Sequence, residues 1–161
     1  MILVECDPDE VLVRTLIPNL TKNDYSHAGN NTGVIKRLIK KIEGTGHIGI
    51  IDKDPGSIPP GYFNKFDLVQ EWESLNIELL KAPNNAKLIV LYPNLEGWSI
   101  TATRFIHLKL KDYSLPESEK ELHKIINEKP NLLKFAKLIT DLEKKSKHVQ
   151  ELKAILMEYH K

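Results

Sequence analysis

Four carboxylates lie within six residues near the start of the chain. The stretch I-L-V-E-C-D-P-D-E-V-L-V carries Glu5, Asp7, Asp9 and Glu10. Like charges at this spacing repel one another, so the stretch needs either contact with solvent or a bound cation. A cation site built from oxygen atoms alone, without Cys or His ligands, suits Mg²⁺ or Mn²⁺.

A second acidic pair follows another apolar run. In H-I-G-I-I-D-K-D-P-G, Asp52 and Asp54 come at the end of a predicted strand over residues 47–52. Active sites of open parallel sheets collect outside the carboxyl ends of the strands, so Glu5 and both aspartates should converge if their strands are neighbours. An alternative stays open for each motif alone, because acidic caps and Asp-x-Asp turns before Pro-Gly are common.

The elements that position these acids alternate along the chain. Apolar, β-prone runs predict strands at residues 2–5, 24–28, 47–52, 76–80 and 87–92. Helical spacing predicts helices from the caps Asp7 and Asp9 to near Pro18, then at 32–43, 66–74 and 95–108, followed by a C-terminal region that is almost all helix with an interruption at Pro130. Such alternation indicates an α/β fold with a mostly parallel sheet flanked by helices. We predict an α/β domain at 1–112 and a helical C-terminal extension at 113–161 packed on it.

The bulk properties limit the class of protein. The chain has 161 residues and a net charge of +1, so no overall field indicates a nucleic-acid or membrane partner. The single cysteine, Cys6, excludes an internal disulfide framework, and the nearby acids should raise the pKa of its thiol. The N-terminus lacks the pattern of a signal peptide, and no apolar run approaches the roughly 20 residues that span a bilayer. We therefore expect a soluble cytoplasmic protein.

Three segments, taken in order, resemble the Toprim domain. They are L-V-E-C-D-P-D-E-V-L-V, G-N-N-T-G-V-I-K-R-L and I-G-I-I-D-K-D-P-G. Toprim is the catalytic module of bacterial-type primases, topoisomerases, small RNA-maturation nucleases and the overcoming-lysogenisation-defect (OLD) nucleases. The resemblance covers about residues 1–92, and more loosely extends to 110. It departs from the family at Cys6, where glycine is usual, and at Pro55-Gly56, where the glycine comes closer than in many members.

The resemblance implies roles for particular acids. Glu5 matches the motif glutamate, a general acid/base or metal ligand, Asp52 and Asp54 match the metal-binding pair, and Asp9 matches the second acid of the nuclease branch. The segment L-Y-P-N-L-E-G-W resembles one in OLD-like and small stand-alone Toprim proteins, where a glutamate, here Glu96, joins the metal site. The expected catalytic residues are Glu5, Asp9, Asp52 and Asp54, and Glu96 is added to them as a metal ligand. A helix N-terminus also favours glutamate through its dipole, which leaves a structural role for Glu96 open.

Two further segments are candidates for substrate binding. The loop Gly29-Asn30-Asn31-Thr32-Gly33 precedes a predicted helix and could hold a phosphate at the helix N-terminus, which points to Gly29, Asn30 and Gly33. By the resemblance to OLD nucleases, Lys109 or Lys111 would stabilise developing charge. Lysines near a helix end are usually just solvated, so that reading stays open as well.

Taken together, the resemblance implies a nuclease that hydrolyses phosphodiester bonds in DNA or RNA with Mg²⁺ or Mn²⁺. A second interpretation is a non-catalytic Toprim-like module that acts with an ATPase or another partner. A third is a receiver-type domain with Asp52 as phosphoacceptor. A homodimer is also left open, and no membrane partner is expected.

Overall fold

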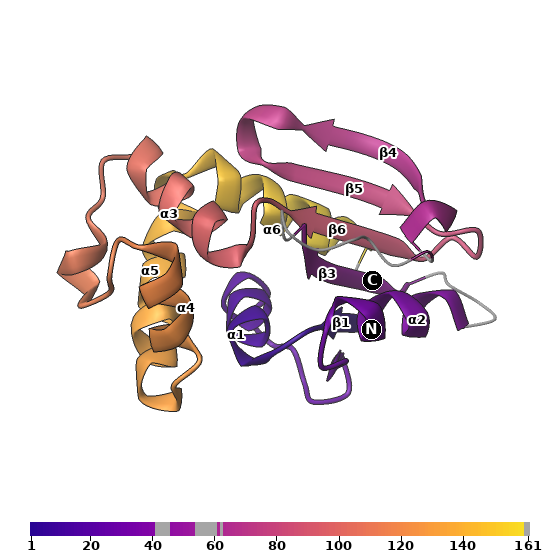
Figure 1. Cartoon of the computed structure of the whole chain (residues 1–161), viewed down its shortest axis with the longest axis horizontal. Helices are drawn as coiled ribbons and strands as arrows, with labels where there is room; N and C mark the ends of the chain where they lie inside the picture. The colour runs from indigo at the N-terminus through magenta and orange to yellow at the C-terminus, as the bar shows by residue number, and fades with distance from the viewer. Residues whose placement is uncertain (41–45, 54–60, 62, 160–161) are drawn as a thin grey trace.

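The computed structural model describes residues 1–40, 46–53, 61 and 63–159, which form a six-stranded mixed sheet flanked by helices (Figure 1). The predicted α/β fold with a mostly parallel sheet and a C-terminal helical extension is confirmed. The strands are β1 (Ile2–Val4), β2 (Tyr25–His27), β3 (Ile48–Asp52), β4 (Asp67–Trp72), β5 (Ile77–Lys81) and β6 (Lys87–Leu91). Their order across the sheet is β2-β1-β3-β6-β5-β4.

The parallel part of the sheet is built from β2, β1, β3 and β6. The carboxyl ends of these strands therefore meet at one edge. Three helices begin just beyond that edge: α1 (Asp7–Leu16) follows β1, α2 (Asn31–Lys40) follows β2, and α3 (Leu95–Phe105) follows β6. Residues 41–43 of the predicted second helix lie outside the described residues, and α3 ends three residues before the predicted boundary.

The predicted helix at 66–74 is wrong. Residues Asp67–Trp72 form β4, an edge strand that pairs antiparallel with β5 and has an irregular register between Leu68 and Gln70. The spacing of Leu68, Val69 and Trp72 fits a helical face, but pairing with β5 decides the conformation, and strand preference depends strongly on such neighbours. Asn76, with φ of 55°, takes the left-handed conformation that lets the chain return into β5.

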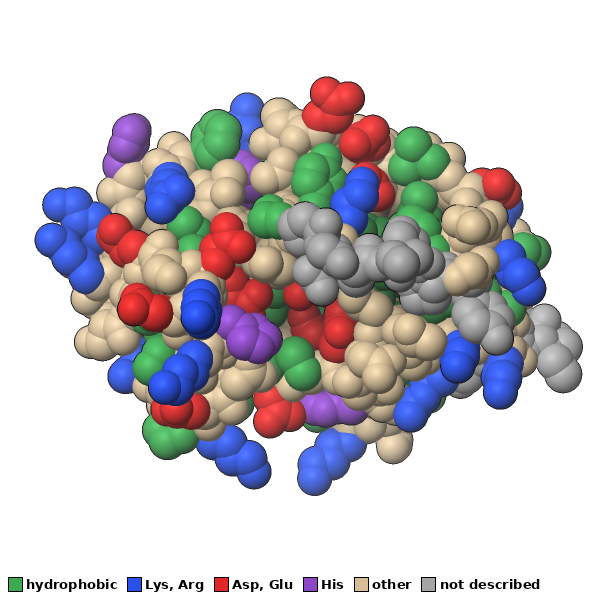
Figure 2. Space-filling model, viewed as in Figure 1, with side chains coloured by type: hydrophobic (Ala, Val, Ile, Leu, Met, Phe, Trp, Pro, Cys, Tyr) green, Lys and Arg blue, Asp and Glu red, His purple; other side chains and the backbone are tan. Residues whose placement is uncertain are grey.

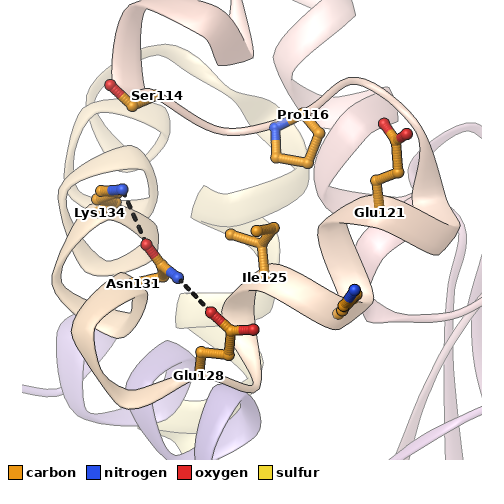
Figure 3. A pocket seen from close by; sticks show the side chains of 8 residues that line it. Ser114, Pro116, Glu121, Ile125, Glu128, Asn131 and Lys134 are labelled. Carbon is orange, nitrogen blue, oxygen red and sulfur yellow. Dashed lines mark hydrogen bonds between the residues drawn. The ribbon is translucent and has the colours of Figure 1, made fainter.

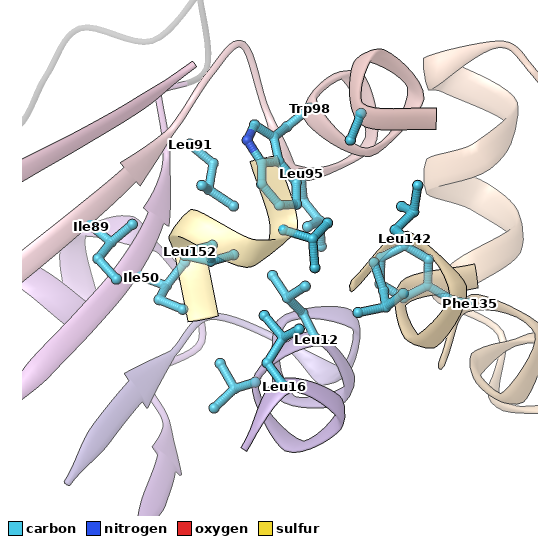
Figure 4. Close-up of a cluster of buried hydrophobic side chains, with 14 of the residues drawn as sticks. Leu12, Leu16, Ile50, Ile89, Leu91, Leu95, Trp98, Phe135, Leu142 and Leu152 are labelled. Carbon is cyan, nitrogen blue, oxygen red and sulfur yellow. The ribbon is translucent and has the colours of Figure 1, made fainter. Parts of the chain in front are cut away.

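The sheet buries both faces. Alternate residues of β3 and β6, such as Ile50 and Ile89, pack against α1 and the C-terminal helices (Figure 4). On the opposite face, Ile51 and Val90 share a buried cluster with residues of α2. A Cβ on Gly49 would lie 2.6 Å from Val34 Cγ1, so α2 approaches the sheet this closely because the residue is glycine.

The C-terminal helices complete one face of the molecule. They are α4 (Glu119–Ile126), α5 (Lys129–Lys145) and α6 (Lys147–Tyr159), joined to α3 through the short 3₁₀ helix η3 (Leu110–Tyr113). Pro130 lies in the first turn of α5, where its missing N–H costs nothing, and a further break occurs at Ser146. Phe135 of α5 shares a buried cluster with Leu12 and Leu16 of α1 (Figure 4). No helix in the described part of the chain has the length and apolar character that crossing a membrane requires.

Candidate metal centre

Four carboxylates converge at the carboxyl edge of the parallel strands. Glu5 directly follows β1, Asp52 ends β3, Asp9 lies in the first turn of α1 and Glu96 in the first turn of α3. These elements are neighbours because β1 pairs with β3 and β3 pairs with β6. Figure 2 shows acidic side chains gathered at the centre of one face of the molecule, with histidine side chains beside them. The predicted convergence is thus present for Glu5 and Asp52.

Glu5 is held against the end of β3. The backbone N–H of Asp52 donates to Glu5 Oε1 at 3.2 Å, and Asn31 Nδ2 donates to the backbone carbonyl of Asp52 at 3.0 Å. Burial, followed by the negative charge of Asp9, raises the pKa of Glu5 to about 7, although hydrogen bonds from the backbone of Asp52 and Asn31 oppose the shift. Glu5 therefore carries a proton in part of the molecules at neutral pH.

Asp9 is buried beneath the start of α1. The backbone N–H and the thiol of Cys6 both donate to Asp9 Oδ2, at 3.2 and 3.3 Å. The prediction of Asp7 and Asp9 as helix caps is thus wrong, because the N-cap residue of α1 is Cys6. Asp9 is the third residue of the helix, and its side chain accepts the hydrogen bond from the Cys6 backbone. Burial raises the pKa of Asp9 to about 6 in spite of these bonds, and burial together with the charge of Asp9 also raises the pKa of the Cys6 thiol.

Asp52 has the largest shift of the group. Burial, and then the charges of Asp9, Glu5 and Glu96, raise its pKa to about 9. Its Oδ1 is buried and has no hydrogen-bond partner among the described residues. Within this part of the chain, no lysine or arginine forms an ion pair with Glu5, Asp9 or Asp52. Asp52 is consequently protonated at neutral pH, because no cationic side chain in the described part of the chain compensates its charge.

Glu96 is joined to the group by a residue that the sequence analysis missed. His123 of α4 places Nδ1 2.8 Å from Glu96 Oε1, and the Glu96 side chain is only 7% exposed while that of His123 is 69% exposed. The opposite ring nitrogen thus remains accessible beside the centre. No local signal marks His123, because 27 residues separate it from Glu96 and only the packing of α4 on α3 brings them together.

The other two acids of the opening stretch belong to a different group. His27 Nε2 lies 2.7 Å from Glu10 Oε2, and His27 Nδ1 lies 3.6 Å from Asp7 Oδ1. Among the described residues, these three form the group whose ligand atoms lie within 4.8 Å of one another, closer than the oxygens of the buried centre. Partial burial would raise the pKa of Glu10, but hydrogen bonds from Tyr25, His27 and Arg14 outweigh it and lower the pKa. Arg14 also pairs with Glu10 at 3.1 Å, so this second group has a cationic partner.

The glycine-rich loop lies near the centre but is partly used for structure. Gly29, with φ of 82°, donates its backbone N–H to the carbonyl of Glu5 at 3.1 Å. Asn30 Oδ1 accepts from the backbone N–H of Gly33 at 2.8 Å and thereby caps α2. Its neighbour Asn31, which we did not single out from the sequence, is the loop residue that contacts β3. A role of this loop in substrate binding stays a prediction.

The remaining predicted site residues lie elsewhere. Lys109 is exposed and precedes η3, beyond the end of α3 at Phe105, which itself lies about 13 Å along the helix axis from Glu96, so the fold does not group it with the carboxylates. Trp98, which follows Glu96 on α3, is fully buried and donates from Nε1 to the carbonyl of Leu75, so it belongs to the core. Asp54 lies outside the described residues.

The donor set suits a hard divalent cation. All four side chains offer carboxylate oxygens, which Mg²⁺ and Mn²⁺ prefer, and Asp52 supplies a buried oxygen with no partner among the residues described here. The residues therefore fit the predicted metal.

Comparison with protein-family models, with curated proteins and with solved structures finds no match to this chain.

Proposed function

We propose that this protein is a nuclease of the Toprim type, which hydrolyses phosphodiester bonds with Mg²⁺ or Mn²⁺. The observation that carries the proposal is the uncompensated group of Glu5, Asp9, Asp52 and Glu96 at the carboxyl edge of the parallel strands. Burying such a group without a counter-charge is costly, and proteins retain it where a cation or a proton is part of the function.

The surroundings of the group favour a phosphorylated substrate. Helices α1, α2 and α3 all begin at this edge, so the positive ends of three helix dipoles point towards it. A phosphate that approaches a carboxylate centre alone would be repelled, whereas one that shares a divalent cation with the carboxylates is attracted. A divalent cation at this place would activate a water molecule and stabilise negative charge on the phosphate.

The chain's own residues have distinct roles in this proposal. Glu5, Asp52, Asp9 and Glu96 supply the oxygen ligands. Asn31 and the backbone of Asp52 fix the end of β3 against Glu5. His123 orients Glu96 from outside the centre, as hydrogen-bonded neighbours of metal ligands commonly do. Asp54 remains a fifth expected ligand on the evidence of the sequence resemblance alone.

The proposal is tested by metal binding and cleavage measured on the same variants. Mn²⁺ and Mg²⁺ are titrated by calorimetry into the wild type, Asp52→Asn and the exposed control Asp112→Asn, and each protein is incubated with plasmid and with single-stranded oligonucleotides. We expect the wild type and the control to bind metal and to cleave, and Asp52→Asn to lose both properties, because asparagine removes the charge and keeps the shape. A wild type that binds no metal would refute the proposal.

Metal binding without cleavage would favour the second interpretation, a Toprim-like module without turnover. Such a module would need a partner, and an ATPase of the kind fused to OLD nucleases is the partner that the sequence resemblance implies. Repeating the cleavage assay after adding the partner's nucleotide-bound form would then separate a dormant enzyme from a binding module.

Removing the His123 side chain should weaken metal binding without unfolding the protein. Because its side chain is mostly exposed and its contact is with Glu96, we expect His123→Ala to lower Mn²⁺ affinity about ten- to hundredfold, the usual effect of losing a neighbour of a metal ligand. The matched control is Lys124→Ala, the next residue on α4. Calorimetry should show weaker Mn²⁺ binding for His123→Ala and wild-type binding for Lys124→Ala. Equal Mn²⁺ affinities for the two variants would mean that the contact of His123 with Glu96 has only a structural role.

A further inference from the structure

A cavity of about 430 Å³ lies at the opposite end of α3 from the carboxylates. Its lining includes Ser74, Leu75, Phe105, Lys145, Lys147 and His148, which come from the turn before β5, the end of α3 and the junction of α5 and α6. Phe105 follows Glu96 by nine residues of one helix, so about 13 Å along the helix axis separates this cavity from the carboxylate centre.

Positive charge surrounds one side of the cavity. Lys145 and Lys147 flank Ser146, where α5 ends and α6 begins, and neither lysine forms an ion pair with a residue that the structure describes. The first N–H groups of α6 have no acceptor within the helix. By contrast, Lys144 on the same helix end pairs with Asp141. The two unpaired lysines and the helix N-terminus together favour an anion.

An aromatic side chain is presented on the other side. Phe105 is 66% exposed at the end of α3, and its ring centroid lies 5.0 Å from that of His148 with a tilt of 53°. A large apolar side chain that is this exposed contributes little hydrophobic stabilisation to the fold. It offers a flat surface on which another ring could stack.

Buried polar atoms without partners lie at the same junction. His148 is 2% exposed, yet its Nε2 has no hydrogen-bond partner among the described residues, and the same holds for Oγ of the fully buried Ser146. Buried polar groups are nearly always bonded, so the unpartnered Nε2 of His148, a residue that lines the cavity, points to a missing ligand or bound water. Burial lowers the pKa of His148, so its neutral ring can either donate or accept at pH 7.

A second cavity of similar volume, between α4 and α5, lacks this combination (Figure 3). Its polar side chains satisfy one another: Lys134 donates to Asn131, and Asn131 donates to Glu128. Its glutamates also balance its lysines.

We propose that the cavity beside Phe105 binds a nucleoside phosphate, with the base stacked on Phe105 and the phosphate between Lys145 and Lys147 at the start of α6. The ligand is either a free nucleotide or the phosphorylated end of a single strand, since both present the same groups. The site is separate from the carboxylate centre and does not depend on its being a nuclease.

Binding is measured on the full chain in EDTA, so that no divalent cation takes part. The probes are AMP, a 5′-phosphorylated hexathymidylate, adenosine and inorganic phosphate. Binding of each probe is measured by calorimetry and by the change in tryptophan fluorescence, since the ring of Trp98 lies 6.2 Å from that of His148. The variants are Lys145→Gln with Lys147→Gln, and Phe105→Ala. The charge-matched control is Lys111→Gln with Lys120→Gln, two exposed lysines away from the cavity.

We expect one of the phosphorylated probes to bind, and both cavity variants to weaken it about tenfold or more while the control does not. A tighter complex with AMP would identify a free nucleotide as the ligand, and a tighter complex with the hexanucleotide would identify a strand end. Absence of binding, or equal losses in cavity and control variants, would overturn the proposal, as would a Phe105→Ala protein of unchanged affinity. Asp52→Asn should bind as the wild type does, so failure of the nuclease proposal would leave this result intact.

Discussion

Replacing Asp52 by asparagine should stabilise the metal-free protein at pH 8, although most substitutions at buried positions destabilise. The Asp52 carboxylate is repelled by Asp9, Glu5 and Glu96 and has one oxygen without a partner in the described structure. With a pKa of about 9, Asp52 is largely protonated in the folded protein at pH 8 but ionised in the unfolded chain, and a neutral asparagine removes the cost of that proton uptake. The free energy of unfolding should therefore rise by about 3 kcal/mol, the scale of an unpaired buried charge. Excess Mn²⁺ should reverse the order, because only the wild type gains the binding energy.

The same carboxylates fix the sign of the pH dependence. The pKa values of Glu5, Asp9 and Asp52 are raised on folding, to about 7, about 6 and about 9, so the folded protein binds more protons than the unfolded chain between about pH 4 and pH 9. Stability of the metal-free protein must therefore fall as the pH rises through this window. With saturating Mn²⁺ the fall should be much smaller, since the metal replaces the protons.

Urea denaturation at pH 5 and pH 8, in EDTA and in Mn²⁺, measures both effects. Asp7→Asn is the matched control, because it removes a carboxylate from the same helix start that is about half exposed and lies beside His27. We expect Asp7→Asn to lower the free energy of unfolding slightly, whereas Asp52→Asn should raise it. If Asp52→Asn were less stable than the wild type in EDTA, the carboxylate would have a hidden partner and the centre would not be uncompensated.

Truncating Phe135 should have the largest effect on stability. The side chain is fully buried on α5 and belongs to the cluster that holds Leu12 and Leu16 of α1 (Figure 4). Phe135→Ala should cost about 3–5 kcal/mol, through lost burial and the cavity left behind. Because α1 carries Asp9, we also expect the metal-induced stabilisation to require an intact α5.

Leu133→Ala provides the control, since Leu133 lies on the same helix with 79% of its side chain exposed. Its effect should stay within about 0.5 kcal/mol. Urea unfolding followed by far-ultraviolet circular dichroism should show a single transition for all three proteins. A loss of less than about 1 kcal/mol in Phe135→Ala, or a separate transition of the C-terminal helices, would contradict a core shared between α1 and α5.

Much of the local structure was predictable because it depends on local patterns. The apolar run before Glu5 and the run that ends in Asp52 are strands in the structure, and a helix follows Glu5 as predicted. Since parallel strands share one carboxyl edge, these acids were expected to meet if their strands were neighbours, and the pairing of β1 with β3 in the structure meets that condition. The role of the acids as a metal centre stays a prediction.

Other features depended on contacts between distant residues. The conformation of Asp67–Trp72 is set by pairing with β5, which outweighs a helix-like spacing, and the break at Ser146 has no strong local signal. The contact of His123 with Glu96 exists only because α4 packs on α3.

The acidic stretch from Glu5 to Glu10 separates most clearly what the sequence determines from what the tertiary structure decides. The sequence by itself determined that four neighbouring acids repel one another and need counter-charges. Only the tertiary structure decided that they separate, because α1 directs Asp9 inwards and Asp7 and Glu10 outwards. The outward pair meets His27 and Arg14, whereas Asp9 is buried with Glu5 and Asp52 and has no ion pair with a cationic side chain among the described residues.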